Sequence, residues 1–110
     1  MSDLIDHDHK EAAKEYKEAS GERGRKFTEW QNEVEDSTSF DDKTRELMML
    51  AVASAIKCDY CIDAHSKKAI RHGADREEVA DAVQIAAEVR AASTVAYGVD
   101  SFKNFDDFDE

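Results

Sequence analysis

The residues whose types and spacing suggest chemistry are two cysteines, Cys58 and Cys61, and a histidine one helical turn later, His65. Positions three and four apart share a face of a helix, so these three side chains are expected on one side of a helix. The thiolate is the reactive form of cysteine, and the positive end of a helix dipole favours it. A histidine at this spacing can accept or pass on the thiol proton. The pattern therefore predicts thiol chemistry.

These two cysteines are the only ones in the chain. A disulfide that closes so short a loop stabilises a fold little, and a reducing cytosol does not maintain structural disulfides. The pair is therefore interpreted as redox-active or metal-binding rather than as a staple. The helix dipole favours Cys58 as the more reactive thiolate, whereas the nearby histidine favours Cys61, and the sequence leaves this choice open.

A carboxylate, Glu46, precedes Cys58 by twelve residues and begins a strongly apolar segment. On a helix its face continues through apolar positions, and a carboxylate at the edge of a core needs a partner. Two interpretations stay open. Glu46 orients His65, as a catalytic base usually requires, or it forms an ordinary salt bridge with Lys43 or Arg45.

The elements that position these residues are predicted to be helices, because the chain has no proline and only four glycines. Apolar spacing and capping residues predict an all-α fold of about six helices. Gly21 and Gly24 are expected to end the first helix, and Phe27 and Trp30 are expected to be core residues. The helices are expected over residues 3–19, 25–34, 41–57, 59–72, 75–89 and 91–102.

One domain is expected from 110 residues. It divides into an acidic N-terminal helical region (1–36), a core that carries the cysteine pair (37–105) and an acidic tail (106–110). The run from Leu47 to Ile56 is apolar on every side of its helix, which is typical of a helix buried all round. A domain of this size can bury such a helix only against a partner subunit, so a homo-oligomer is expected.

The charge of the chain excludes several partners. There are 26 acidic and 15 basic side chains, for a net charge of −11, which disfavours binding to nucleic acid or to an anionic membrane. No apolar run reaches the roughly 18 residues of a membrane helix. The acidic N-terminus lacks the pattern of a signal peptide. A cytoplasmic protein is therefore expected.

The motif as a whole resembles a known family. Glu46 is followed after eleven residues by Cys58-Asp-Tyr-Cys61, then by His65, a helix that ends at Gly73 and a helix that opens with two glutamates. Over residues 40–102 this arrangement resembles the AhpD-like (alkylhydroperoxidase D-like) branch of the carboxymuconolactone decarboxylase superfamily. The resemblance implies a helical bundle, a homotrimer or homohexamer, and an antioxidant peroxidase or disulfide reductase. It implies no bound metal or organic cofactor.

The resemblance also implies roles for the residues. Cys61 would attack the hydroperoxide and become a sulfenic acid, and Cys58 would resolve it as a disulfide. His65 and Glu46 would form a proton relay through water. Tyr60 occupies a position where some relatives have a histidine of the relay, and tyrosine is a poor base at neutral pH. The implied electron donor is an external lipoyl or thioredoxin-like dithiol.

Three alternatives are weighed against this interpretation. The cysteine pair with His65 and His72 resembles a zinc pattern, but on one helix its ends would lie about 21 Å apart. A zinc site shared with His7 or His9 of a neighbouring subunit is the variant that geometry allows. A decarboxylase like the name-giving members acts on a small lactone acid without a cysteine pair. The last alternative is a non-catalytic assembly module.

Overall fold

The computed structural model describes residues 7–108. The expected helical positions 3–6, the tail positions 109–110 and the side chains of His7 and Phe108 lie outside the described part. Within it there is no strand, which confirms the all-α class. The elements are α1 (His7–Ser37), α2 (Asp42–Ile56), α3 (Asp59–Arg71), α4 (Arg76–Gly98), the 3₁₀ helix η1 (Val99–Lys103) and the short α5 (Asn104–Phe108).

The expected number of about six helices is wrong, because the described part has four long helices, and η1 and α5 have only five residues each. The first two expected helices form α1, which runs through Gly24 and breaks direction only at Gly21, with φ 60° and ψ −133°. The expected helices 75–89 and 91–102 merge into the continuous α4, and the end of the second one, from Val99 on, belongs to η1. No glycine or proline interrupts the sequence around Arg90, so nothing there ends a helix.

Short connections bring α2, α3 and α4 together. Asp41 caps α2 by accepting a hydrogen bond from the backbone N–H of Thr44 at 2.7 Å. Lys57 ends α2 in the left-handed conformation, with φ 59°, and α3 begins two residues later. Gly73, with φ 95°, turns the chain after α3. A capping box between Asp75 and Glu78 then starts α4.

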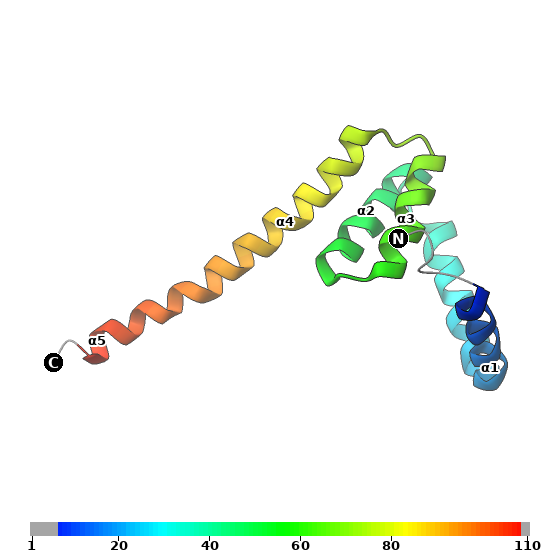
Figure 1. Cartoon of the computed structure of the whole chain (residues 1–110), viewed down its shortest axis with the longest axis horizontal. Coiled ribbons are helices and arrows are strands. Elements are labelled where there is room, and N and C mark those ends of the chain that lie inside the picture. Colours follow the sequence, from blue (N-terminus) through cyan, green and yellow to red (C-terminus); the bar gives the residue numbers. More distant parts are fainter. Residues whose placement is uncertain (1–6, 109–110) are drawn as a thin grey trace.

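The packed part of the molecule is the set α2, α3 and the first half of α4, with α2 in contact with the other two helices. Its buried apolar residues are few and mostly small: Leu50, Ala53, Ala69, Ala74 and Ala82. Figure 1 shows α1 extending from this centre on one side and the outer half of α4 extending on the other. Among the described helices, none is both long enough and apolar enough to cross a membrane.

The single chain is open and leaves much apolar surface uncovered. Its radius of gyration is 19.5 Å, against about 13 Å for a compact domain of this length. The expectation that α2 is buried all round is not met within one chain, because Val52 is 61% and Ile56 66% exposed. Phe27 and Trp30 were expected in the core, and this is wrong: their rings contact each other but are more than half exposed.

Candidate redox site

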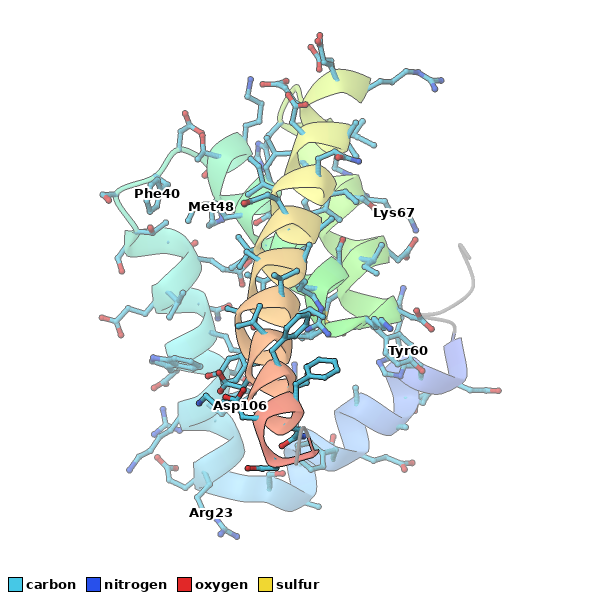
Figure 2. The ribbon with its side chains drawn as sticks, turned by 90° about the vertical axis from the view of Figure 1, so that its left-hand side faces the viewer. Arg23, Phe40, Met48, Tyr60, Lys67 and Asp106 are labelled. Carbon is cyan, nitrogen blue, oxygen red and sulfur yellow. A yellow bond between two sulfur atoms is a disulfide. The ribbon has the colours of Figure 1, made fainter. Side chains whose placement is uncertain are left out.

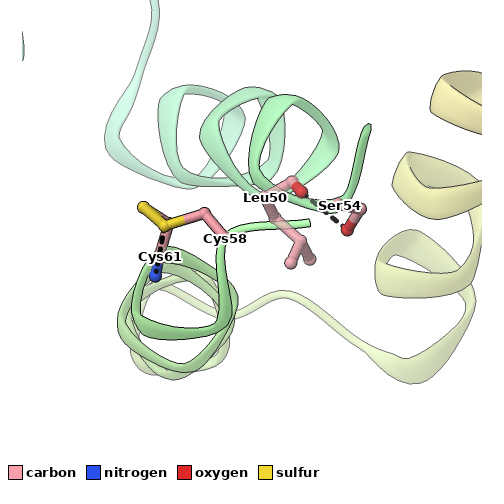
Figure 3. The surroundings of a disulfide bond; sticks show 4 residues. All are labelled: Leu50, Ser54, Cys58 and Cys61. Carbon is pink, nitrogen blue, oxygen red and sulfur yellow. Dashed lines mark hydrogen bonds between the residues drawn. A yellow bond between two sulfur atoms is a disulfide. The ribbon is translucent and has the colours of Figure 1, made fainter. Parts of the chain in front are cut away.

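The cysteine pair lies at the start of α3. Cys58 is the N-cap residue, and its Sγ accepts a hydrogen bond from the backbone N–H of Cys61 at 3.3 Å. The two sulfurs form a disulfide, with 5.2 Å between the Cα atoms. Figure 3 shows this pair beside the last turns of α2, where the hydroxyl of Ser54 donates to the carbonyl of Leu50. Cys58 therefore lies at the positive end of the α3 dipole.

Cys61 and His65 face a groove of about 280 Å³ between α2 and α3. Its lining is otherwise apolar and comes from α2: Met48, Met49, Val52, Ala53 and Ile56. Cys58 does not line this groove. A molecule bound in the groove would therefore meet the sulfur of Cys61 and the imidazole of His65, with an apolar wall of α2 opposite.

Glu46 is fully buried and holds His65 from behind. Its Oε1 accepts a hydrogen bond from Nδ1 of His65 at 2.8 Å, and its Oε2 accepts one from Nε of Arg45 at 2.9 Å. Burial by itself would raise the pKa of Glu46, but these hydrogen bonds outweigh it and hold the pKa below its usual value. Both interpretations from the sequence therefore describe the same carboxylate, which pairs with His65 and with Arg45.

The ionised carboxylate fixes the tautomer of His65. A carboxylate only accepts hydrogen bonds, so Nδ1 of His65 must carry the proton that Glu46 accepts. In the neutral ring this leaves Nε2 as the nitrogen that can accept a proton. The pair is therefore a histidine oriented by a carboxylate, and it lines the same groove as Cys61.

Arg45 is a site residue that sequence reasoning treated only as one of two ordinary ion-pair partners. Its side chain is 15% exposed, and Nη1 donates to the carbonyl of Glu35 at 2.8 Å and to Asp42 at 2.9 Å. It thus ties Glu46 to the end of α1. The other expected partner, Lys43, pairs with Glu78 instead. The contact with Glu35 had no signal in the sequence, because it depends on how α1 meets α2.

Tyr60 lies on the flank of the motif rather than in the groove. It is 45% exposed, and its ring stacks on that of His9, with 4.5 Å between centroids and 24° between planes. Figure 2 shows Tyr60 beside the first turn of α1. This stack places the start of α1 against the cysteine motif.

The structure does not gather the candidate zinc ligands. Among residues 7–108, no group of three or more His, Cys, Asp or Glu side chains is arranged to hold a metal ion. His72 is the C-cap of α3, and its Nδ1 lies 3.8 Å from a carboxylate oxygen of Asp42. His65 uses Nδ1 for Glu46.

The fold and site define an all-helical protein with a disulfide-forming cysteine pair backed by a histidine and a carboxylate. Residues 24–103 match the model of the carboxymuconolactone decarboxylase family. The chain therefore belongs to this family, and its similarity to two AhpD proteins places it in the AhpD-like branch.

Three curated relatives illustrate the similarity. The chain is 35% identical over 71 residues to "Uncharacterized protein 4 in cox locus" of Paracoccus denitrificans, covering 64% of each protein. It is 40% identical over 50 residues to "Alkyl hydroperoxide reductase AhpD" of Rhodospirillum centenum and of Hyphomonas neptunium. These matches cover 46% of this chain and 27% and 28% of the two AhpD proteins. The chain thus spans less than two thirds of the curated relatives it matches.

Proposed function

We propose that the protein is a thiol-dependent peroxidase of antioxidant defence that reduces organic hydroperoxides with the Cys58–Cys61 dithiol. The observation that carries this proposal is the shared groove: Cys61 and His65 line it together, and Glu46 holds His65 by Nδ1. The similarity to alkyl hydroperoxide reductases supports the same reaction class. The apolar wall from α2 suits a hydroperoxide with an apolar body.

The reaction begins with the reduced dithiol. The thiolate of Cys61 attacks the terminal oxygen of the hydroperoxide, so that an S–O bond forms and the O–O bond breaks. The leaving alkoxide takes a proton through the relay of His65 and Glu46 and departs as an alcohol. The Cys61 sulfenic acid is then attacked by the sulfur of Cys58, which forms the disulfide and releases water. Tyr60 lies outside the groove and takes no part in this scheme as an acid or base.

The position of Cys58 suits its attack on the sulfenic acid of Cys61. A sulfur at a helix N-cap gains from the dipole and from the N–H of Cys61, which favours the thiolate needed for attack on a sulfenic acid. An external dithiol, lipoyl or thioredoxin-like, then reduces the disulfide in two exchange steps, becoming oxidised itself and restoring both thiols. The scheme uses no bound metal or organic cofactor. The cytoplasmic location expected from the sequence stays a prediction.

The assembly expected from the sequence is part of the proposal. The exposed apolar side chains of α4, which include Ile85, Val89 and Val95, leave apolar faces of this helix uncovered in the single chain. A homotrimer or homohexamer would cover these faces with copies of the same chain. A decarboxylase is the weaker candidate, because the groove lining contains no lysine or arginine to bind a carboxylate substrate.

Mass spectrometry combined with a peroxide assay tests the proposed function. Reduced protein should consume one equivalent of cumene hydroperoxide and lose both titratable thiols. Cys61→Ser should abolish consumption, whereas Cys58→Ser should consume one equivalent and stop at a sulfenic acid on Cys61. Full activity in Cys61→Ser would refute the assignment. His72→Asn, a histidine change outside the groove, is the control and should retain activity.

A further inference from the structure

The first limb of α1, residues 7–20, reaches the cysteine motif from far away in the sequence. His9 of this N-terminal limb is half-buried, and its ring stacks on Tyr60 with 4.5 Å between centroids. Tyr60 is the residue between the two cysteines that directly precedes Cys61. The stack therefore joins the N-terminal limb to the part of α3 that carries the disulfide.

Gly21 bends α1 so that the N-terminal limb returns towards α3. Its backbone has φ 60° and ψ −133°, a conformation that residues with a Cβ atom rarely adopt. A Cβ atom added at Gly21 would meet nothing within 4 Å. The glycine is therefore required by the backbone conformation and not by lack of space. With any other residue, α1 would favour a straighter helix that carries His9 away from Tyr60.

The limb covers one flank of the motif and leaves the groove open. Successive residues of a helix point about 100° apart, so Tyr60 and Cys61 face different directions. Cys61 lines the groove with His65, whereas neither Tyr60 nor any residue of the N-terminal limb lines it. A small molecule therefore has a route to Cys61 that the limb does not obstruct.

A protein partner needs more room than a small molecule. Even a small redox encounter buries roughly 600 Å² on each side, which corresponds to a circle of about 14 Å radius around the disulfide. Neighbouring Cα atoms are about 3.8 Å apart, and the ring of Tyr60 is in contact with His9. A globular dithiol protein whose contact area is centred on the disulfide and extends over Tyr60 would therefore meet the first turn of the N-terminal limb.

We propose that the N-terminal limb, held in place by the stack of His9 on Tyr60, selects the reductant. It hinders dithiols on globular proteins and admits small dithiols. This inference rests on the proposed dithiol function. In either case one thiol of the external dithiol attacks a sulfur of the Cys58–Cys61 disulfide, and a mixed disulfide forms. The second external thiol then attacks the mixed disulfide and frees the protein sulfur. Two electrons and two protons pass to Cys58 and Cys61, and the donor leaves as a disulfide. The limb acts through Tyr60 and is a selectivity element, with no role in bond making.

Reduction of the oxidised protein by two donors tests this selectivity. One donor is dithiothreitol, the other is reduced thioredoxin, and alkylation with mass detection follows the loss of the disulfide. His9→Ala and Gly21→Ala should each raise the thioredoxin rate relative to the dithiothreitol rate by about three- to tenfold, the range of one aromatic stack. Tyr60→Ala should give the same gain, and the double variant with His9→Ala no more, because both break one contact.

Matched controls distinguish the loss of the His9–Tyr60 stack from a general loosening of the N-terminal limb. Tyr16→Ala removes another exposed aromatic ring of the same limb, and Gly98→Ala makes the glycine change where the backbone is helical and the space is open. Both should leave the ratio of the two rates unchanged. An unchanged or lower ratio in His9→Ala, or equal acceleration by both donors, overturns the inference. Failure of the wild type to consume hydroperoxide would instead refute the proposed function, whatever the ratio.

Discussion

The carboxylate of Glu46 accepts a hydrogen bond from Nδ1 of His65 at 2.8 Å, joining α2 to α3 across nineteen positions of sequence. The carboxylate is fully buried, and its other oxygen pairs with Arg45. A buried charge is tolerated only when it is paired and hydrogen-bonded. This contact therefore serves the packing of two helices and the orientation of the imidazole at the same time.

Loss of the carboxylate charge should slow the proposed chemistry. In Glu46→Gln the amide keeps the size of the side chain but carries no charge opposite Nδ1 of His65. We expect hydroperoxide consumption to fall by roughly 10- to 100-fold, below the full range of general acid–base catalysis. Glu88→Gln, the same change at an exposed position of α4, should leave the rate unchanged. Equal rates in the two variants would remove Glu46 from the mechanism.

His65→Asn separates the fold from the chemistry. The asparagine amide can still donate a hydrogen bond to Glu46, but it has no nitrogen that accepts a proton. We expect the free energy of unfolding to change by less than about 1.5 kcal/mol and peroxide consumption to fall by about 10²- to 10⁴-fold. Urea unfolding and the peroxide assay measure the two quantities. A rate close to that of the wild type would contradict the role of His65 as the base.

Stability should fall at acid pH because of Glu46. Its native pKa is below the reference value of 4.5, so the native state binds fewer protons than the unfolded state in this range. The stabilisation is complete above about pH 4.5 and is lost as the pH falls through the native pKa. Urea unfolding between pH 7 and pH 3 should show a shallower decline in Glu46→Gln. Parallel curves for the two proteins would show that other groups cause the acid sensitivity.

Arg45 should matter for stability as well as for orientation. Arg45→Met removes the donor to Oε2 of Glu46 and the bond to the carbonyl of Glu35. Hydrogen bonds to charged groups contribute about 1.5–3 kcal/mol each, so we expect a loss of at least about 2 kcal/mol in the free energy of unfolding. Arg25→Met on exposed α1 is the control, since surface ion pairs contribute little. Equal losses of unfolding free energy in Arg45→Met and Arg25→Met would contradict the larger contribution of Arg45.

The open shape of the chain predicts a charge-sensitive assembly. Val89→Glu and Val95→Glu place charges on exposed apolar positions of α4. If copies of the chain cover this helix, both variants should shift sedimentation velocity towards the monomer. Gln84→Glu, an added charge at an exposed polar position of α4, tests for nonspecific charge effects. A wild type that sediments as a monomer at micromolar concentration would refute the proposed oligomer.

The sequence by itself determined the helical class, the start of α3 at the cysteine pair and the common side of Cys61 and His65. These features depend on spacing, caps and the absence of proline, which act over one or two turns. The predicted number of about six helices was wrong, because Gly21 bends α1 without ending it and no residue interrupts α4.

Only the tertiary structure decided which partners meet. The sequence offered Lys43, Arg45 and His65 for Glu46, and the packing of α2 on α3 selected the last two. The stack of His9 on Tyr60 joins segments about fifty residues apart and had no local signal. Contacts of this kind depend on how whole helices pack. The partner of such a side chain cannot be predicted from the local sequence, because only the path of the backbone brings the two side chains close together.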